Sequence, residues 1–406
     1  MKKDAAGKAG WVTRKLGDFS AAISTGPFGS LLHKSDYVDN GVPLVNPTNM
    51  VNDRILPDAS MLISETTRQR LNSYVLEEGD IVVGRRGEIG RCAVVGPTEA
   101  GWLCGTGSFF IRPLPSIDSQ FLAHLIRSGT YRGRLEEAAT GTTMKNLSNA
   151  TLSDLVVSIP LLPEQRRIVA ILDEAFDCIA TGQGNAEKNL QNARALFESH
   201  LQAVFTQRGG CTSVPIGDIG TVFDGPHATP RTVDAGPIFL GISALQDGDV
   251  NLGETRHVTP EDFRRWTRRV RPQPGDVVFS YETRLGQAAS IPDGLECCLG
   301  RRMGLVRVDR RRVEPRFFVY QYVSAPYREF LSSRTVRGAT VDRIALKEFP
   351  SFPIILPPLD QQKAIVKMLD ALKAETQRLE AIYRQKLAAL DALKKSLLDE
   401  AFTGVL

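Results

Sequence analysis

The residues of this chain that could carry chemistry mostly lack the neighbours that such chemistry needs. Asp173-Glu174-Ala175-Phe176 looks like a helicase-type D-E-A-x box. The chain has no G-x-x-x-x-G-K-[ST] phosphate-binding loop for such a box to serve, so we expect no nucleotide site there. The histidines are scattered without the spacing of metal ligands, at His33, His124, His200, His227 and His257.

Three further motifs resemble catalytic signatures but are each incomplete. Gly105-Thr106-Gly107-Ser108-Phe109 lacks the second glycine of a nucleophile elbow. Asp293 and Glu296 resemble a nuclease carboxylate pair, but Cys298 stands where a lysine is needed. Asn46-Pro47-Thr48-Asn49 is not the Asn/Asp-Pro-Pro-aromatic motif of amino-methyltransferases, and their glycine-rich cofactor loop is also missing. We therefore predict a protein that is not an enzyme, with no catalytic, cofactor or metal site of its own.

Arginine is the main residue type in the second half of the chain that could bind a ligand. The net charge is only +4, but between Cys211 and Pro350 the positive charge is almost entirely arginine. Arginine suits bidentate contacts with phosphates and with guanine bases. An ordinary solvated surface has the same composition, so each cluster has two interpretations. The clusters are Arg264, Arg265, Arg268, Arg269 and Arg271, then Arg301-Arg302, and Arg310 to Arg312.

Length and composition bound the kind of protein. The 406 residues are 42% hydrophobic and 24% charged, which predicts a globular protein of two to four domains. No apolar run approaches the roughly 18 to 20 residues that span a membrane. The basic N-terminus lacks the apolar core of a signal peptide, and the six cysteines show no C-x-x-C pairing. We expect a cytoplasmic protein with buried thiols and no membrane partner.

A long internal repeat organises the elements that must position any functional residue. Residues 163–206 match residues 360–403 at a constant shift of roughly 197 residues, so that Gln165 falls on Gln362 and Leu172 on Leu369. Both segments begin near a proline and an acidic residue, which suits the start of a helix. We predict two long helices of the same kind.

The segments before the two helices repeat as well. Gly26-Pro27-Phe28 corresponds to Gly225-Pro226-His227. Gly79-Asp80-Ile81-Val82-Val83 corresponds to Gly275-Asp276-Val277-Val278-Phe279, and both of these segments have the pattern of a turn followed by a strand. Residues 120–137 have the apolar spacing of one amphipathic helix. The expected boundaries are a first domain over 1–160, a helix over 161–208, a second domain over 209–356 and a helix over 357–406.

The second long helix carries a heptad seam, which is typical of a coiled coil. In the first helix the equivalent seam is weaker in the middle, where Gly182 and Gly184 each cost about 1 kcal/mol relative to alanine. These glycines mark a kink, a break or a close approach of the partner helix. The seam of the second helix consists of Ile365, Leu369, Leu372, Thr376, Leu379, Tyr383, Lys386, Leu390, Leu393 and Leu397.

Over essentially its whole length the chain resembles the specificity subunit of Type I restriction-modification systems. The resemblance rests on Gly26 to Ser30, on Gly79 to Val83 with Gly87 and Gly90, on the junction Ile159 to Val169, and on the ending Ser396 to Gly404. It implies an α+β fold in which two similar α/β target recognition domains with mixed, twisted sheets are separated by two long antiparallel helices. A pseudo-twofold axis would relate the halves of such a chain.

The same resemblance implies partners. Each domain is expected to read one half of a split site in double-stranded DNA. The helices are expected to set the spacer and to dock two methyltransferase subunits, with restriction and translocase subunits joining through the complex. S-adenosylmethionine, ATP and magnesium are then expected in those partner subunits, with no cofactor in this chain.

Candidate DNA contacts are basic and amide residues in the glycine-punctuated loops, because phosphate contacts position a protein and base contacts specify the sequence. In the first domain they are Lys34, Asn46, Asn49, Arg85, Arg86, Lys145 and Asn146. In the second domain they are His227, Arg231, Tyr281, Arg284, Arg301, Arg302 and Arg343. Each could equally be an ordinary solvated side chain.

Two other hypotheses remain open at the level of sequence. One is a DNA-modifying enzyme whose specificity region has this pattern and whose catalysis lies in the same chain. The other is a coiled-coil scaffold without a DNA role. Binding of S-adenosylmethionine would favour the first, and the absence of salt-dependent DNA binding would favour the second.

Overall fold

The computed structural model describes residues 10–86, 88–139, 146–206, 212–337 and 341–403. The chain divides into two compact units, which are described separately. The first unit contains residues 1–186 and 385–406, and the second contains residues 187–384. Among the described residues, no helix combines the length and the hydropathy that crossing a membrane would require.

The β-rich part of the first unit is built on a four-stranded antiparallel sheet in the order β2-β11-β8-β9. Its strands are β2 (Ser20–Thr25), β8 (Ile81–Gly84), β9 (Cys92–Val94) and β11 (Ser108–Pro113). A second sheet, in the order β10-β4-β7-β3, is mixed because β10 runs parallel to β4. Its strands are β3 (Tyr37–Val38), β4 (Val42–Val45), β7 (Leu62–Ile63) and β10 (Leu103–Cys104).

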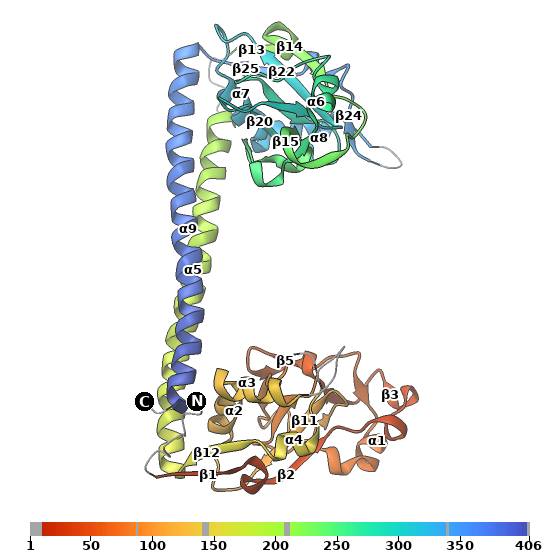
Figure 1. The fold of residues 1–406 in the computed structure, drawn as a ribbon, viewed down its shortest axis with the longest axis vertical. Helices are drawn as coiled ribbons and strands as arrows, with labels where there is room; N and C mark the ends of the chain where they lie inside the picture. The colour runs from red at the N-terminus through yellow and green to blue at the C-terminus, as the bar shows by residue number, and fades with distance from the viewer. Residues whose placement is uncertain (1–9, 87, 140–145, 207–211, 338–340, 404–406) are drawn as a thin grey trace. The chain divides into compact units, whose positions relative to one another are not determined.

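Shorter elements complete this domain (Figure 1). The paired strands β1 (Trp11–Lys15) and β12 (Val156–Pro160) bring its two ends together. The strands β5 (Met50–Val51) and β6 (Arg54–Ile55) form a small hairpin. The helices are α1 (Glu65–Arg70), α2 (Ser119–Arg127), α3 (Gly129–Ala138) and α4 (Asn149–Ser153).

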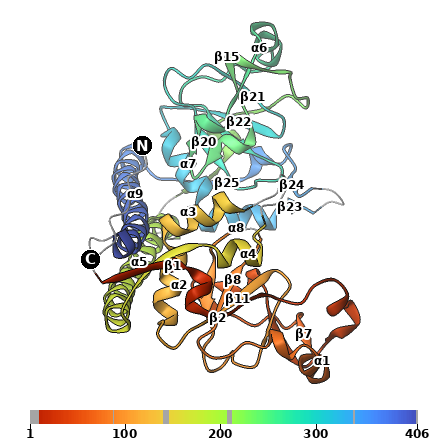
Figure 2. The same ribbon diagram turned by 60° about the horizontal axis from the view of Figure 1, so that its bottom comes forward.

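The second unit repeats this plan with its own four-stranded sheet, in the order β14-β22-β19-β20. The three-stranded sheet β18-β15-β21 is mixed in the same way, with β15 parallel to β21. Paired strands β13 and β25 again join the ends of the domain. Figure 2 gives a clear view of β15, β21 and β22 in this domain. The predicted α+β architecture with mixed sheets is thereby confirmed.

The bounds of these elements are as follows. The strands are β13 (Thr212–Pro215), β14 (Gly220–Asp224), β15 (Thr232–Leu240), β16 (Leu245–Gln246), β17 (Asp249–Val250), β18 (Arg256–Val258), β19 (Val277–Ser280), β20 (Ala288–Ser290), β21 (Cys297–Leu299), β22 (Met303–Val308), β23 (Thr335–Val336), β24 (Arg343–Ile344) and β25 (Pro353–Leu356). The helices are α6 (Pro260–Trp266), α7 (Pro315–Val323) and α8 (Ala325–Ser333).

The prediction of one amphipathic helix over residues 120–137 is wrong, because the segment forms two helices. Ser128 separates α2 from α3 with an extended ψ of 146°, and its hydroxyl donates to the carbonyl of Leu125 at 2.7 Å. Ser324 separates α7 from α8 in the same way, donating to Gln321 at 2.6 Å. A buried serine that hydrogen-bonds to the preceding turn therefore ends the helix at the same place in both domains.

The two long helices are α5 (Leu162–Thr206) and α9 (Leu359–Thr403), which pack together side by side (Figures 1 and 2). They are antiparallel within each unit. In the first unit Gln183 Nε2 donates to Asp391 Oδ1 at 2.6 Å, while further back on α5 the ring of Phe176 meets Lys394. The two helices run antiparallel in the second unit as well.

The helix α5 runs unbroken through both glycines. A Cβ atom on Gly182 would lie 3.4 Å from Leu390 of α9, whereas one on Gly184 would meet nothing within 4 Å. Of the alternatives left open by the sequence, the close approach of the partner helix applies to Gly182. No break occurs at either position.

A buried glutamine ties the start of α5 to the first domain. Gln165 is 1% exposed, and its Oε1 accepts from the backbone N–H of Asp118 at 2.7 Å. Its Nε2 donates to the carbonyls of Ser116 at 3.1 Å and Pro160 at 2.8 Å. These bonds satisfy every hydrogen of the amide at a place from which water is excluded.

The start of α9 is tied to the second domain by the corresponding glutamine. Gln362 is fully buried, and its Oε1 accepts from the backbone N–H of Glu314 at 2.9 Å. Its Nε2 donates to the carbonyls of Arg312 at 2.9 Å and Pro357 at 2.7 Å. Each domain is thus fixed to the helix that follows it by the same set of bonds.

The other helix end enters the same core in each unit. Ala401 and Phe402 of α9 pack in the core of the first unit beside Ile168 and Leu172 of α5. Leu201 and Phe205 of α5 pack in the core of the second unit, which also contains Leu369 of α9. Burial of these apolar side chains stabilises each unit, so domain and helices form one packed body within it.

Candidate nucleic-acid interface

Five chain segments of the first unit meet at one end of its main sheet. Backbone hydrogen bonds join Gly26 N to Ser108 O at 3.0 Å, Gly105 N to Val45 O at 2.9 Å, Arg85 N to Gly107 O at 3.0 Å, and Leu147 N to Arg85 O at 3.3 Å. We call the residues that these bonds bring together the first loop cluster. It consists of Gly26 to Phe28, Asn46, Arg85-Arg86, Gly105 to Gly107, and Asn146.

Glycine is required where these loops cross. A Cβ atom on Gly26 would lie 2.1 Å from the carbonyl oxygen of Gly105, and one on Gly105 would lie 2.3 Å from Asn46 Oδ1. Both distances are shorter than any side chain tolerates, so the loops can approach only because these positions lack a side chain. The close crossing is what presents the neighbouring polar side chains together.

Arg85 is held in place within the first loop cluster. Its Nε donates to Asn146 Oδ1 at 2.9 Å and to the carbonyl of Leu147 at 3.2 Å, and its guanidinium lies 5.9 Å from the ring centre of Phe28. Partial burial, together with the charge of neighbouring Arg86, lowers the pKa of Arg85, which stays charged at neutral pH. Arg86 itself is exposed. The cluster therefore offers a fixed cation, an exposed cation and two amides.

The second unit has an equivalent cluster built on the same backbone bonds. They join Gly225 N to Met303 O at 2.9 Å, Gly300 N to Leu240 O at 2.7 Å, Tyr281 N to Arg302 O at 3.2 Å, and Ile344 N to Tyr281 O at 2.8 Å. Isolated bridges also correspond, pairing Arg86 with Asn146 in one unit and Glu282 with Arg343 in the other. The second loop cluster consists of Asp224 to His227, Gly241 to Ser243, Tyr281 to Arg284, Gly300 to Arg302, and Arg343.

The side chains of the second loop cluster differ from those of the first loop cluster. Tyr281 donates its hydroxyl to Asp224 Oδ1 at 3.1 Å, and His227 Nε2 lies 2.8 Å from Asp224 Oδ2. Burial, followed by the charge of Asp224, raises the pKa of Tyr281. Arg302 pairs with Glu282 at 2.9 Å, and Arg284 donates to the carbonyls of Ile242 and Ser243. The same scaffold thus presents a different pattern of donors and acceptors.

The predicted site residues fall into three groups. Ten lie in the loop clusters, namely Asn46, Arg85, Arg86 and Asn146 in the first, and His227, Tyr281, Arg284, Arg301, Arg302 and Arg343 in the second. Lys34 and Arg231 are exposed and lie outside the bonds that define the clusters. Asn49 is 5% exposed, accepts from Asn46 N at 2.8 Å and donates to Leu56 O at 2.9 Å, so it shapes the loop from inside. Lys145 lies outside the described residues.

Sequence reasoning missed two residues that shape the clusters. Phe28 lies beside the Arg85 guanidinium, and Asp224 connects Tyr281 with His227. Both belong to the repeated Gly-Pro loop. The repeated loop is the signal that could have found them, although neither side chain is basic or an amide.

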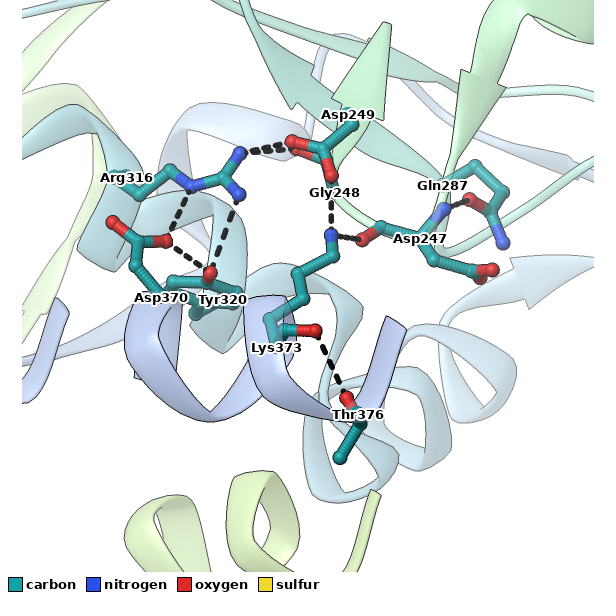
Figure 3. Close-up of polar contacts among 9 residues, drawn as sticks. All are labelled: Asp247, Gly248, Asp249, Gln287, Arg316, Tyr320, Asp370, Lys373 and Thr376. Atoms are coloured by element: carbon teal, nitrogen blue, oxygen red, sulfur yellow. Dashed lines mark hydrogen bonds and ion pairs between the residues drawn. The ribbon is translucent and has the colours of Figure 1, made fainter. Parts of the chain in front are cut away.

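The second domain is fastened to α9 by a polar network at the β16–β17 hairpin (Figure 3). Lys373 donates to the carboxylate of Asp249 and to the carbonyl of Asp247, the latter at 2.6 Å. Arg316 of α7 pairs with Asp249 and, at 3.1 Å, with Asp370 of α9. Burial acts to raise the pKa of Asp249, but the hydrogen bonds and charges of Arg316 and Lys373 outweigh it and leave that pKa lowered.

The first unit has a looser counterpart at the β5–β6 hairpin. Asp53 pairs with Arg127 of α2 at 3.1 Å and lies 3.7 Å from Lys394 of α9. Lys394 also lies 5.1 Å from the ring centre of Phe176 on α5. In both units, then, a hairpin aspartate links a domain helix to α9 and limits how the domain can move on the helix pair.

Comparison with known proteins identifies this architecture. A family model described as the Type I restriction modification DNA specificity domain matches residues 8–191 and 268–388, which is most of the chain. The chain belongs to this family. It is therefore the non-catalytic DNA specificity subunit of a Type I restriction-modification system and a component of such a complex. Membership also implies that the cofactors of the complex lie in partner subunits.

Individual relatives cover nearly the full length of this specificity subunit. The Type I restriction enzyme EcoKI specificity subunit of Escherichia coli K12 is 22% identical over 91% of this chain and 83% of its own. A chain from a solved assembly of a type I R-M system matches with a TM-score of 0.74 and 23% identity, over 98% of this chain and 99% of that one. The HsdS subunit from Thermoanaerobacter tengcongensis matches with a TM-score of 0.63 and 22% identity, over 100% and 99%.

Membership of this family decides between the hypotheses that the sequence left open. Catalysis in the same chain and a scaffold without a DNA role are both set aside, because this chain is the non-catalytic DNA specificity subunit.

Proposed function

We propose that the specificity subunit reads an asymmetric DNA target in two separate halves, one with each loop cluster. The observation that carries this proposal is the pair of clusters built on equivalent backbone hydrogen bonds but lined by different side chains. Arg85 and Asn146 in the first cluster correspond to Tyr281 and Arg343 in the second. Base edges are distinguished by their donors and acceptors, so different side chains on one scaffold select different half-sites.

Within this proposal the predicted residues have two roles. The exposed cations and amides of the clusters contact DNA, together with Lys34, Arg231 and Lys145. Asn49 and Tyr281, whose polar atoms are used inside the protein, position the loops instead. The corresponding domain limits are 1–160 and 209–356, with spacer helices over 161–208 and 357–406.

The helices set the distance between the half-sites in this proposal. A helix of 45 residues is about 68 Å long at 1.5 Å per residue. Half-sites on one face of DNA lie about 34 Å apart, one helical turn. The helices are longer than spacing alone requires, which leaves surface for partner subunits.

Exposed apolar side chains on the helices support two equivalent docking sites for methyltransferase subunits. Ile171 of α5 and Leu393 of α9 are exposed in the first unit, and Met368 of α9 and Leu196 of α5 in the second. The repeat relates Ile171 to Met368 and Leu196 to Leu393, so each unit offers the same two positions. Single exposed apolar residues are ordinary on a protein surface, so the support for docking is their recurrence at positions that the repeat relates. The docked subunits would bind S-adenosylmethionine and methylate adenine, and restriction subunits would use ATP and magnesium.

An exchange of domains tests the proposal. Residues 11–159 are replaced by the equivalent domain of a relative, and methylation is mapped in the presence of the partner methyltransferase. One half-site should change while the other stays the same. A change in both halves would refute the modular assignment.

An insertion tests the role of the helices. About four residues, one helical turn, are added near Gly182 and the methylated sequence is mapped again. The spacer should change while both half-sites remain. An unchanged spacer would mean that the helices do not set the distance.

A further inference from the structure

A group of arginines beside the second loop cluster carries charge that the protein does not neutralise itself. Arg264 and Arg265 end α6, and Arg268 and Arg269 follow it, and all four are exposed. Within the described part of the chain, Arg264, Arg265 and Arg268 have no carboxylate partner, although α6 itself carries Glu261 and Asp262. Arg269 approaches Asp224 only at 3.9 Å.

In the equivalent helix of the first domain, the arginines are paired with carboxylates. α1 occupies the same place in the repeat, capped by Ser64 as α6 is capped by Thr259. Arg68 there donates to both oxygens of Glu65 at 2.6 and 2.8 Å, and Arg70 pairs with Asp36 at 2.8 Å. Carboxylates of the protein therefore neutralise the arginines of α1, whereas the arginines of α6 remain available to a ligand.

Three of these arginines, Arg265, Arg268 and Arg269, share one hollow with the second loop cluster. A cavity of about 620 Å³ is lined by Asp224 to Ala228 on one side and by Arg265, Trp266, Arg268 and Arg269 on the other. The Arg265 guanidinium lies 5.3 Å from the ring centre of Trp266, a contact that holds the side chain in place. Any anion bound by these arginines would therefore lie directly beside the residues that face the half-site.

We propose that Arg265, Arg268 and Arg269 bind backbone phosphates of double-stranded DNA next to the half-site of the second domain. Guanidinium groups match phosphate geometry, and phosphate contacts fix register without carrying sequence information. Because carboxylates of the first domain neutralise Arg68 and Arg70 of α1, only the second domain offers a phosphate contact at this place in the repeat. The inference rests on the proposed function and adds an asymmetry between the two domains that the half-site assignment does not contain.

Salt dependence measures these contacts directly. The full-length specificity subunit with its partner methyltransferase is titrated with a random-sequence duplex over a series of KCl concentrations. Each phosphate contact adds about −0.9 to the slope of log K against log salt. The variant R265Q/R268Q/R269Q should lower the magnitude of that slope by about 2 to 3. The variant R265K/R268K/R269K should keep a slope close to that of the wild type, since the charges remain.

The variant R310Q/R311Q/R312Q is the matched control, because it removes three exposed arginines of the same domain that lie outside this cavity. Unlike Arg265 and Arg268, these three side chains bind within the protein, to Pro274, Asp309 and Asp218. The slope of this control variant should equal that of the wild type. The ratio of affinities for the mapped target and for random duplex should also stay unchanged in R265Q/R268Q/R269Q. An unchanged slope in that variant, an equal loss in the control, or a reduced affinity ratio would each overturn the inference. A wild-type protein that binds no duplex would instead overturn the proposed function.

Discussion

Gln165 and Gln362 make the same three hydrogen bonds, about 197 residues apart in the chain. Each amide oxygen accepts from the N-cap residue of a domain helix. Each amide nitrogen donates once to the loop before that helix and once to the backbone just before the long helix. The side chains are 1% and 0% exposed, so no water can replace these bonds. The direction in which each long helix leaves its domain is therefore fixed by the same contact in both halves.

Replacing either glutamine should destabilise its unit strongly. In Gln362→Ala the N–H of Glu314 and the carbonyls of Arg312 and Pro357 lose their partner, and at about 1 kcal/mol or more for each unsatisfied group the loss should be at least about 3 kcal/mol. Urea denaturation followed by circular dichroism measures the loss. The neighbouring Gln361→Ala, at an exposed position, is the control and should change stability by less than about 0.5 kcal/mol. Equal effects of the two substitutions would contradict the anchoring role.

Gly184→Ala should stabilise the protein by about 1 kcal/mol, because alanine is the better helix former and the added methyl meets nothing. Gly182→Ala should gain less, since its methyl would lie 3.4 Å from Leu390. The two variants are compared by thermal unfolding. A larger gain at Gly182 would show that the helices do not approach each other as described.

Asp249 should make the second unit sensitive to acid. Its pKa is lowered in the folded protein, so its pairs with Lys373 and Arg316 stabilise fully above the ordinary value of 3.8 and are lost as the pH falls below it. Asp249→Asn should therefore cost stability at pH 5 and above, by about 1 to 2 kcal/mol given its partial exposure. The cost should shrink below about pH 4.

Asp247→Asn is the control for this experiment. Asp247 lies in the same hairpin, but it contacts Lys373 and Gln287 through its backbone alone (Figure 3). Its substitution should leave the pH dependence of unfolding as in the wild type. A cost of Asp249→Asn that stayed constant down to acidic pH would argue against the ion pairs as its cause.

Aspartate at the exposed apolar positions should remove partner subunits one at a time. Ile171→Asp with Leu393→Asp alters the first unit alone, so native mass spectrometry should find one methyltransferase subunit per chain in place of two. Met368→Asp with Leu196→Asp should give the same result through the second unit. All four substitutions together should abolish docking, and two subunits bound to the fourfold variant would place the interface elsewhere.

The repeat in the sequence predicted more of the fold than any single motif did. Helix spacing and matched residues such as Gln165 and Gln362 located both long helices within a few residues, because a shift that stays constant leaves no room for insertions. The break at Ser128 was missed, since apolar spacing continues across it and only the serine hydroxyl ends the helix.

Only part of the candidate site could be predicted from the sequence, because the fold decides which side chains pair with one another. Arg68 and Arg265 look alike in sequence, yet of the two only Arg68 pairs with a carboxylate in the structure. The sequence predicts Tyr281 as a DNA contact, but in the structure its hydroxyl donates to Asp224. Glycine-rich loops indicate which segments meet at the end of each main sheet, while burial and pairing decide which of their side chains face outward.

The most direct test of the two-part assignment is a map of methylated bases in the genome of a host that carries this restriction-modification system alone. The account predicts one asymmetric sequence in which two different half-sites are separated by a run of unspecified bases of fixed length. A single uninterrupted sequence, or two identical half-sites, would contradict it.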